Sequence, residues 1–258
     1  MLKKLLKHEW IATARRYGLF YLILAAVTLF TALVRMIDID SIVISGIQGL
    51  LTGAYVITGF GVLFCSIGLA VVRFYKNMVT DEGYLTFTLP AKVEQLVGAK
   101  VIVALVWQVI TVAAILLSLG CVFVFGKMDP EQISELIRMF EAESGIRFPV
   151  FAAVMAVCLV YQLLLYYLAV AVGQLFPGNK IVGSVIGYLV LSFVIEIAMV
   201  VCILCVGFVI GFAELDSAMQ IQGNMTVLMF ALAGLMGIIA IAEYFLTCNL
   251  LKKKLNLT

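Results

Sequence analysis

The sequence predicts an all-α integral membrane protein with six transmembrane helices, an N-terminal interfacial helix and both termini in the cytoplasm. Hydrophobic residues make up 64% of the 258-residue chain and charged residues 12%, whereas a soluble domain is about half apolar and about a quarter charged. The apolar residues form runs of about 20 or more, the length that a helix needs to cross a hydrocarbon core of about 30 Å. The basic residues gather in alternate connecting segments, which orients such a bundle.

The first 16 residues predict a cytoplasmic helix that lies on the membrane surface. Five of them are basic, and at about 100° per residue the apolar side chains gather on one face, which Glu9 interrupts. A cleaved signal peptide is the alternative, but the next apolar run is long and shows no small-residue cleavage pattern near its end. The segment is therefore expected to be retained. Its apolar face consists of Leu2, Leu5, Leu6, Trp10 and Tyr17.

Six apolar runs follow, and they predict a single transmembrane domain over residues 1–258. No internal repeat is visible, and no linker separates a second domain. A tight turn at Phe176–Lys180 joins the fourth run to the fifth. The six runs cover about 17–37, 45–72, 96–125, 148–175, 181–210 and 225–246.

The basic residues orient these spans. Thirteen of the 17 Lys and Arg residues fall in the segments that six spans would place on one side of the membrane. Because basic residues are retained on the cytoplasmic side, this side and both termini are predicted to be cytoplasmic. The thirteen are Lys3, Lys4, Lys7, Arg15, Arg16, Arg73, Lys76, Lys92, Lys100, Lys180, Lys252, Lys253 and Lys254.

The segment 127–147 predicts a short amphipathic helix on the outer side. Asp129 can cap its start, Pro130 suits the first helical position, and Gly145 can end it. Packing on the outer rim and closure over an exit are both compatible with such a helix. Its apolar face consists of Ile133, Leu136, Ile137 and Phe140.

The sequence contains no catalytic constellation, so an enzyme is not expected. The single histidine, His8, lies in the basic N-terminal segment, and the motifs of serine hydrolases, zinc proteases and phosphate-binding loops are absent. Cys202 and Cys205 form a C-x-x-C pair, but no second pair completes a metal site. All six cysteines lie in apolar runs, which favours a packing role. No metal or cofactor is expected in this chain, and its net charge of +2 does not indicate nucleic acid.

Two of the predicted spans carry a polar face. Because polar groups that face lipid lack partners, these faces should point into the bundle, a subunit interface or a wet cavity. Helix packing and a translocation path explain them equally well. The second span contributes Ser45, Gln48, Thr52, Tyr55, Gly59 and Ser66, and the fifth contributes Ser184, Tyr188, Ser192 and Glu196.

Two acidic residues lie within predicted spans. Glu196 is about midway along the fifth span, where an ionised carboxylate without a partner is costly. It is expected to be protonated, hydrogen-bonded to Tyr or Ser, or exposed to a water-filled path. Glu243 lies near the inner end of the sixth span, a few turns from three lysines, and is expected to snorkel to the interface.

Glycines spaced four apart indicate close contacts between helices, although the pattern is common in apolar sequence. Two of the three pairs lie on the spans that carry the polar faces. The pairs are Gly49 with Gly53, Gly183 with Gly187, and Gly207 with Gly211.

The segment 73–95 predicts a folded cytoplasmic loop between the second and third spans. It contains both basic and acidic residues, and Gly83 and Pro90 break regular structure. We expect that a soluble partner presses on this loop.

These features resemble the permease subunits of ABC-2-type ATP-binding-cassette exporters, especially the small six-span subunits of Gram-positive bacteria. The segment 1–16 resembles their basic N-terminal helix, and residues 74–100 resemble their loop between spans 2 and 3. In that pattern an acidic-Gly stretch and a Leu-Pro pair precede a span that begins with a Gly-x-Lys-like stretch. The corresponding residues are Asp81-Glu82-Gly83, Leu89-Pro90 and Gly98-Ala99-Lys100.

The resemblance implies a half-transporter in a bacterial cytoplasmic membrane. Two such subunits, identical or sister chains, would pair in the lipid bilayer, and each would dock on a cytoplasmic ATPase that binds ATP and Mg. The loop after span 2 would couple the ATPase to transport, and spans 2 and 5 would line the path. The outer segment 127–147 departs from relatives that often elaborate the loop before span 6. The implied coupling residues are Lys76, Asp81, Glu82, Gly83, Leu85 and Pro90, and the implied path residues are Gln48, Thr52, Tyr55, Ser184, Tyr188, Ser192 and Glu196.

Two other classes of function are compatible with the sequence. A secondary transporter driven by an ion gradient would need intramembrane charges, broken helices and inverted repeats, of which only the central charge of Glu196 is evident. A membrane scaffold or immunity protein that transports nothing would tolerate substitution of Gln48, Tyr55 and Glu196 without any change in flux.

Overall fold

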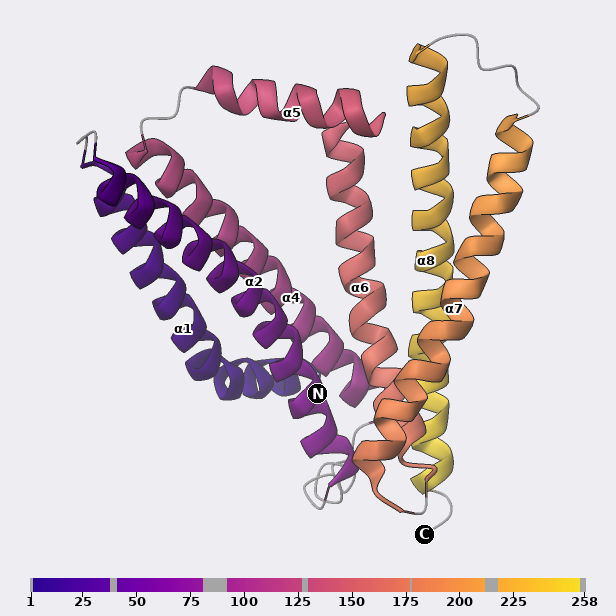
Figure 1. Ribbon diagram of the computed structural model, residues 1–258. Coiled ribbons are helices and arrows are strands. Elements are labelled where there is room, and N and C mark those ends of the chain that lie inside the picture. The colour runs from indigo at the N-terminus through magenta and orange to yellow at the C-terminus, as the bar shows by residue number, and fades with distance from the viewer. Residues whose placement is uncertain are drawn as a thin grey trace. The chain divides into compact units, whose positions relative to one another are not determined.

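A computed structural model of the chain describes residues 2–37, 41–80, 92–126, 130–176, 178–211 and 218–255, and these residues are almost entirely helical (Figure 1). Six of the helices in these ranges, all except α5, are long and apolar enough to cross a membrane. The predicted all-α fold with six candidate spans is therefore confirmed, and it fits a multi-pass membrane protein. The helices are α1 (Leu2–Arg35), α2 (Ile42–Val79), α4 (Val93–Phe125), α5 (Pro130–Ser144), α6 (Phe148–Gly173), α7 (Lys180–Gly211) and α8 (Ala218–Leu255).

The helix α1 joins two segments that the sequence analysis separates. Residues 1–16 were expected to form an interfacial helix before a span over 17–37, and the structure has one continuous helix over Leu2–Arg35. No proline interrupts this range, so the helical hydrogen-bond ladder can continue. Figure 1 shows that α1 is bent, with its first turns at a clear angle to the remainder. A surface location of those first turns stays a prediction.

The chain forms two compact units. Unit 1 comprises Met1–Arg73 and Gln95–Ile133, and unit 2 comprises Phe74–Glu94 and Ser134–Thr258. Unit 1 thus holds α1 with most of α2 and α4, and unit 2 holds the end of α2, most of α5, and α6 to α8. The prediction of a single domain over the whole chain stays a prediction.

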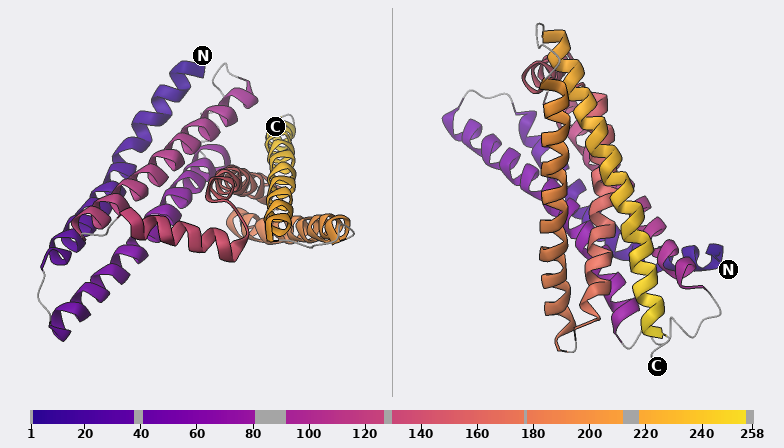
Figure 2. Two further views of the ribbon diagram at one scale, coloured as in Figure 1. Left: turned by 90° about the horizontal axis from the view of Figure 1, so that it is seen from above. Right: turned by 90° about the vertical axis from the view of Figure 1, so that its right-hand side faces the viewer.

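In unit 1 the helices α1, α2 and α4 lie side by side (Figures 1 and 2). One buried cluster joins Leu24 of α1, Tyr55 of α2 and Val122 of α4. A second cluster joins Tyr17 of α1 to Val103 and Trp107 of α4. Each helix thus buries one face against the other two, which leaves its remaining apolar surface for lipid.

In unit 2 the helix α6 packs against both α7 and α8, and Figure 2 shows the three running alongside one another. The second half of α6 is the most buried part of the chain, with Leu165 fully buried and Tyr167 1% exposed. By contrast, no residue in the most apolar window of α7 is buried within the chain. The outer surface of α7 is therefore available to lipid or to another subunit.

The helix α5 lies within the segment 127–147, for which an amphipathic helix is predicted, and it ends at a defined junction with α6. Gly145 ends α5 with a φ of +65°, a backbone conformation that favours glycine. The backbone N–H of Phe148 donates a hydrogen bond of 2.8 Å to Glu141 Oε1, so a side chain of α5 caps the start of α6. Phe140 packs edge-on against Phe151 with ring centroids 5.2 Å apart. Asp129, the predicted cap of α5, lies outside the described residues.

The turn between α6 and α7 brings two helices unusually close. Of the G-x-x-x-G pairs, Gly183 and Gly187 lie at this contact: a Cβ at 183 would come within 2.8 Å of Phe176, and one at 187 within 3.2 Å of Val172. Gly49 and Gly53 have no other heavy atom within 4 Å of such a Cβ. Within the described part of the chain, the glycine pattern thus marks a helix contact on α7 but not on α2.

Gly173→Ala should destabilise the contact between α6 and α7. The added methyl group would lie 2.1 Å from Ser184 Oγ and 2.5 Å from the Ser184 backbone nitrogen, so the backbone must shift. Overpacking of this kind costs about 1–3 kcal/mol. We expect a loss of that size in the free energy of unfolding, measured in detergent micelles.

Gly207→Ala is the matched control. Gly207 also lies in a helix, but nothing is within 4 Å of its added Cβ. Alanine is a better helix former than glycine by about 1 kcal/mol, so this variant should be as stable as the parent or slightly more stable. Equal stability of the two variants would contradict the close approach at Gly173.

Candidate functional site

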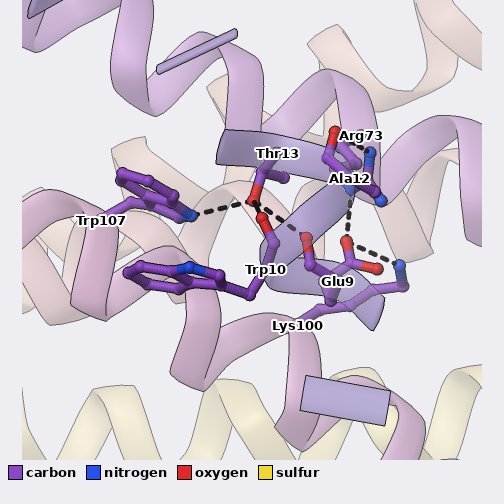
Figure 3. A network of polar contacts seen from close by, with 7 residues as sticks. All are labelled: Glu9, Trp10, Ala12, Thr13, Arg73, Lys100 and Trp107. Carbon is purple, nitrogen blue, oxygen red and sulfur yellow. Dashed lines mark hydrogen bonds and ion pairs between the residues drawn. The ribbon is translucent and has the colours of Figure 1, made fainter. Parts of the chain in front are cut away.

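Three side chains of α1 contact one tryptophan of α4, and two of them, Trp10 and Thr13, are drawn with Trp107 in Figure 3. The indole of Trp107 is stacked on Trp10 with centroids 4.3 Å apart, and on Tyr17 with centroids 4.4 Å apart. Its Nε1–H donates a hydrogen bond of 2.9 Å to Thr13 Oγ1. Trp10, Thr13 and Tyr17 follow the i, i+3, i+7 spacing of one helical face, so an α-helix presents them together. Stacked aromatic pairs contribute about 0.5–1.5 kcal/mol each beyond the area that they bury.

Directly beside these stacked rings, the carboxylate of Glu9 binds two cations (Figure 3). Glu9 Oε1 lies 2.5 Å from Arg73 Nε and 3.3 Å from Lys100 Nζ. The three side chains are largely buried, with 13% of Glu9, 15% of Arg73 and 7% of Lys100 exposed. Glu9 thus joins α1 to the last turns of α2 and the first turns of α4. Removing one partner of a buried ion pair is costly, because the charge of the other was desolvated in order to form it.

The sequence determines this geometry through helical spacing. Lys100 and Trp107 are seven residues apart on α4, and Glu9 adjoins Trp10 on α1, so each helix presents an ionic group beside an aromatic one. The Thr13 hydroxyl also donates to the backbone oxygens of Glu9 and Trp10. The carboxylate, the hydroxyl and the stacked rings therefore form one contact surface, which we call the Glu9–Trp107 clamp; it consists of Glu9, Trp10, Thr13, Tyr17, Arg73, Lys100 and Trp107.

Deeper in unit 1, the polar face predicted on α2 is used for packing. Tyr17 Oη donates a 3.0 Å hydrogen bond to the Ser66 carbonyl, and Ser66 Oγ donates a 3.0 Å bond to Gln108 Oε1. Tyr55 Oη lies 2.8 Å from Ser118 Oγ, and both groups are buried. These side chains therefore link α2 to α1 and α4.

The outer part of the same face also has partners in unit 1. Gln48 Nε2 donates to the carbonyls of Val34 and Ile37, both at 3.2 Å, and so caps the end of α1. Thr52 Oγ1 accepts a 3.1 Å hydrogen bond from Arg35 Nη2 and donates one to the Gln48 carbonyl. Gln48, Thr52 and Tyr55 thus come together on the packed side of α2; their role in a translocation path stays a prediction.

In unit 2 the end of α2 is held by the turn between α6 and α7. Gln174 Nε2 donates to the Met78 carbonyl at 3.4 Å, and Lys180 Nζ donates to the Val79 carbonyl at 3.3 Å. A cation at a helix C-terminus also interacts favourably with the helix dipole. Phe74 is stacked on Tyr167 of α6 with centroids 4.0 Å apart, and both are 1% exposed.

The start of α4 is held in unit 2 by the end of α8. Glu94 forms an ion pair with Lys252, and the Glu94 carbonyl accepts a 3.1 Å hydrogen bond from Tyr244 Oη. Both partners of the ion pair are more than 40% exposed at the side chain, so the pair is weak compared with that of Glu9.

These contacts flank the predicted coupling residues. Lys76 is exposed on the last turns of α2, and its carbonyl accepts a hydrogen bond of 2.5 Å from Thr80 Oγ1. The other predicted coupling residues lie outside the described residues; they are Asp81, Glu82, Gly83, Leu85 and Pro90. Lys76 is therefore the one member of the set whose position can be compared with the clamp, and it lies one turn beyond Arg73 on α2.

On α7 the predicted polar ladder divides into two parts. Ser184 and Tyr188 face α6, because Ser184 adjoins Gly173, and Tyr188 Oη accepts a 3.1 Å hydrogen bond from Gln162. Ser192 donates to the Leu189 carbonyl of its own helix. Glu196 is exposed, and within the described residues its carboxylate forms neither a hydrogen bond nor an ion pair.

Comparison of the chain with models of protein families, with curated proteins and with solved structures gave no match. The class of multi-pass membrane protein therefore rests on the six apolar helices, and the resemblance to exporter permeases stays an expectation.

Glu9 is a member of the site that the sequence alone does not assign. The signal was present, because Glu9 is the one acidic residue among the first 16 and interrupts the apolar face of that segment. An acid at such a position indicates a cation on a neighbouring element. Its partners lie 64 and 91 residues further along the chain, so spacing could not identify them.

Proposed function

We propose that the chain is the membrane-spanning half of an ATP-driven exporter, with ATP and Mg bound by separate cytoplasmic ATPase subunits. The observation that carries this proposal is that the end of α2 and the start of α4, the helices on either side of residues 81–91, are each held to other helices. The helix before these residues is fixed through Arg73 to α1 and through its last carbonyls to Gln174 and Lys180. The helix after them is fixed through Lys100 to α1 and through Glu94 to α8. Helix ends held in this way are suited to pass a force that acts on them to other membrane helices.

The transmission follows from these attachments. ATP binding would close the ATPase subunits and displace the segment 81–91. Within unit 1, the Glu9–Trp107 clamp would carry the displacement to α1. Within unit 2, the capped end of α2 would carry it to the turn between α6 and α7. The bundle would then alternate between inward and outward openings, as ligand-driven population shifts require.

The proposal places the chain in a bacterial cytoplasmic membrane with both termini inside, paired with a second permease subunit that is identical or a sister chain. The exposed apolar surface of α7 is compatible with such a pair. The expected path residues are Gln48, Thr52 and Tyr55 in unit 1 and the polar ladder of α7 in unit 2.

Reversing the charges of the predicted loop should uncouple the ATPase from transport. In Asp81→Lys/Glu82→Lys, two acids that would contact the ATPase become basic, and like-charge contacts across an interface cost several kcal/mol. We expect ATPase activity to persist, while transport per ATP hydrolysed falls at least about tenfold, which corresponds to about 1.4 kcal/mol of coupling. Both rates are measured in proteoliposomes that contain the co-purified ATPase.

Glu135→Lys/Glu143→Lys is the control with the same change in net charge. Both glutamates are exposed on α5, on the predicted outer side. Coupling in this variant should equal that of the parent. The proposal would be wrong if coupling were unchanged in the loop variant, or if transport proceeded without an ATPase and followed an ion gradient.

A further inference from the structure

A single buried stripe on α8 contains one carboxyl group. Ala240, Glu243, Thr247 and Leu251 are spaced three and then four residues apart, so they share one helical face, and each is 5% exposed or less. The helix α8 packs against α6 and α7 in unit 2. Glu243, at 2% exposure, therefore lies inside the packed unit rather than at its surface.

This position contradicts the expectation that Glu243 snorkels to the interface. Both carboxyl oxygens are buried, and neither has a hydrogen-bond partner within the described residues. The first lysine after it on the same helix, Lys252, is nine residues away, about 14 Å along the axis, and pairs with Glu94. Snorkelling requires an exposed carboxyl group, whereas only 2% of Glu243 is exposed.

The groups around Glu243 offer it no positive charge. On α6, Tyr161 is 8% exposed and lies within electrostatic reach of both Glu243 and Glu196 of α7. The described cations on these three helices are Lys180 of α7, which binds the Val79 carbonyl, and Lys252 and Lys253 of α8, of which Lys252 binds Glu94 and Lys253 is exposed. Besides Glu243, the described titratable side chains on the three packed helices are Cys158, Tyr161, Tyr166 and Tyr167 of α6, Lys180, Tyr188, Glu196, Cys202 and Cys205 of α7, and Tyr244, Cys248, Lys252 and Lys253 of α8.

We propose that Glu243 is a proton-binding site of unit 2. A buried carboxylate without a cation or a hydrogen-bond donor is far less stable than the neutral acid, which carries no net charge to desolvate. A metal ion would need further ligands, and no group of three or more His, Cys, Asp or Glu side chains gathers in the described ranges. The ligand that fits a single isolated carboxyl group is the proton.

The proton can leave only when the contact of α8 with its neighbours opens to water. The O–H bond of the Glu243 carboxyl group then breaks, water takes the proton as hydronium, and the carboxylate remains in the wetted contact. Closure reverses the transfer. Each opening of unit 2 would therefore exchange one proton, whatever drives the opening. This inference does not depend on the ATPase. The proton site can therefore fail while the exporter proposal holds, and the exporter proposal can fail while the proton site holds.

Infrared spectroscopy of the purified full-length chain tests the protonation state directly. In a maltoside detergent, which has no carbonyl group, the parent at neutral pH should show the C=O band of a neutral carboxylic acid. Glu243→Gln should lose that band, and Glu135→Gln, which removes an exposed acid of α5, should keep it. An identical band in the parent and in Glu243→Gln would show that Glu243 is ionised and would overturn the proposal.

The pH dependence of stability provides a second test, in which the isosteric glutamine serves as a permanently neutral reference. An unfolded chain ionises this glutamate above pH about 4, whereas the folded chain keeps it neutral. The unfolded parent then binds fewer protons than the folded parent, so its stability falls as pH rises. The folding equilibrium constant of the parent, divided by that of Glu243→Gln, should fall about tenfold per pH unit above that point, until the pH at which the folded chain itself releases the proton.

A ratio that stays constant between pH about 4 and 8 would overturn the proposal, because the glutamate would then titrate as in the unfolded chain. Stabilisation of the parent, but not of Glu243→Gln, by sodium chloride over choline chloride at equal concentration would also overturn it. That result would assign the site to sodium.

Discussion

Trp107→Ala should lower the free energy of unfolding of the chain by about 3–5 kcal/mol, the range for truncating a buried tryptophan. Trp107 is 6% exposed, and its two ring faces contact Trp10 and Tyr17. Removal of the indole leaves a cavity between α1 and α4. It also removes the hydrogen bond that Thr13 Oγ1 accepts from the indole N–H. Reversible unfolding in detergent micelles, monitored by circular dichroism, measures the loss.

Two further variants separate stacking from hydrogen bonding. Trp107→Phe keeps an aromatic ring between Trp10 and Tyr17 but removes the donor, so it should cost about 1 kcal/mol, the typical net value of one hydrogen bond. Trp10→Ala removes a ring that is 36% exposed, and its cost should fall well below that of Trp107→Ala. If Trp10→Ala were as damaging as Trp107→Ala, Trp107 would not be the centre of the clamp.

Glu9→Gln should also have a large effect, because it leaves Arg73 and Lys100 side by side without the carboxylate between them. Breaking a buried ion pair from one side costs about 3–5 kcal/mol. Because 13% of the Glu9 side chain is exposed, we expect about 3 kcal/mol, at the lower end of that range. The same unfolding measurement applies, and the loss should shrink in the triple variant Glu9→Gln/Arg73→Gln/Lys100→Gln, in which all three charges are absent.

Glu94→Gln is the matched control for the Glu9 variant. It also removes a carboxylate that binds a lysine near the start of α4, but the side chains of this pair are 41% and 43% exposed. Exposed pairs of this kind contribute little to stability, so we expect no measurable change. The opposite ranking, with Glu94→Gln more damaging than Glu9→Gln, would refute the assignment of the clamp to Glu9.

The spans could be predicted from sequence because lipid imposes a strict condition on the backbone. Within a hydrocarbon core every backbone N–H and C=O must be paired inside the segment, so an apolar run of sufficient length must be helical. The predicted span over 96–125 accordingly matches α4 (Val93–Phe125), and the turn at Phe176–Lys180 lies between α6 and α7. Gly145 could likewise be assigned as a helix end, because glycine adopts the left-handed conformation readily and this preference does not depend on distant contacts.

The clamp and the buried acid could not be predicted, because both depend on which helix faces are in contact. Hydropathy places Glu243 at the end of a span but does not indicate whether it points to lipid, water or a neighbouring helix. The periodicity of α1 groups Trp10 with Tyr17, yet it cannot identify Trp107, which lies 90 residues further along the chain, as the ring between them. Contacts of such long sequence separation leave no periodic signal within either segment.

The close approach of Gly173 to Ser184 has a mechanical consequence. The distance between α6 and α7 at Gly173 and Ser184 leaves no room for a methyl group. The two helices therefore cannot slide past each other where the turn joins them. Gln174 and Lys180, which border this elbow, hold the final carbonyls of α2. A small rotation of the last turn of α2 should therefore be passed to the start of α7 and displace its far end. Among the described helices α7 is the most apolar.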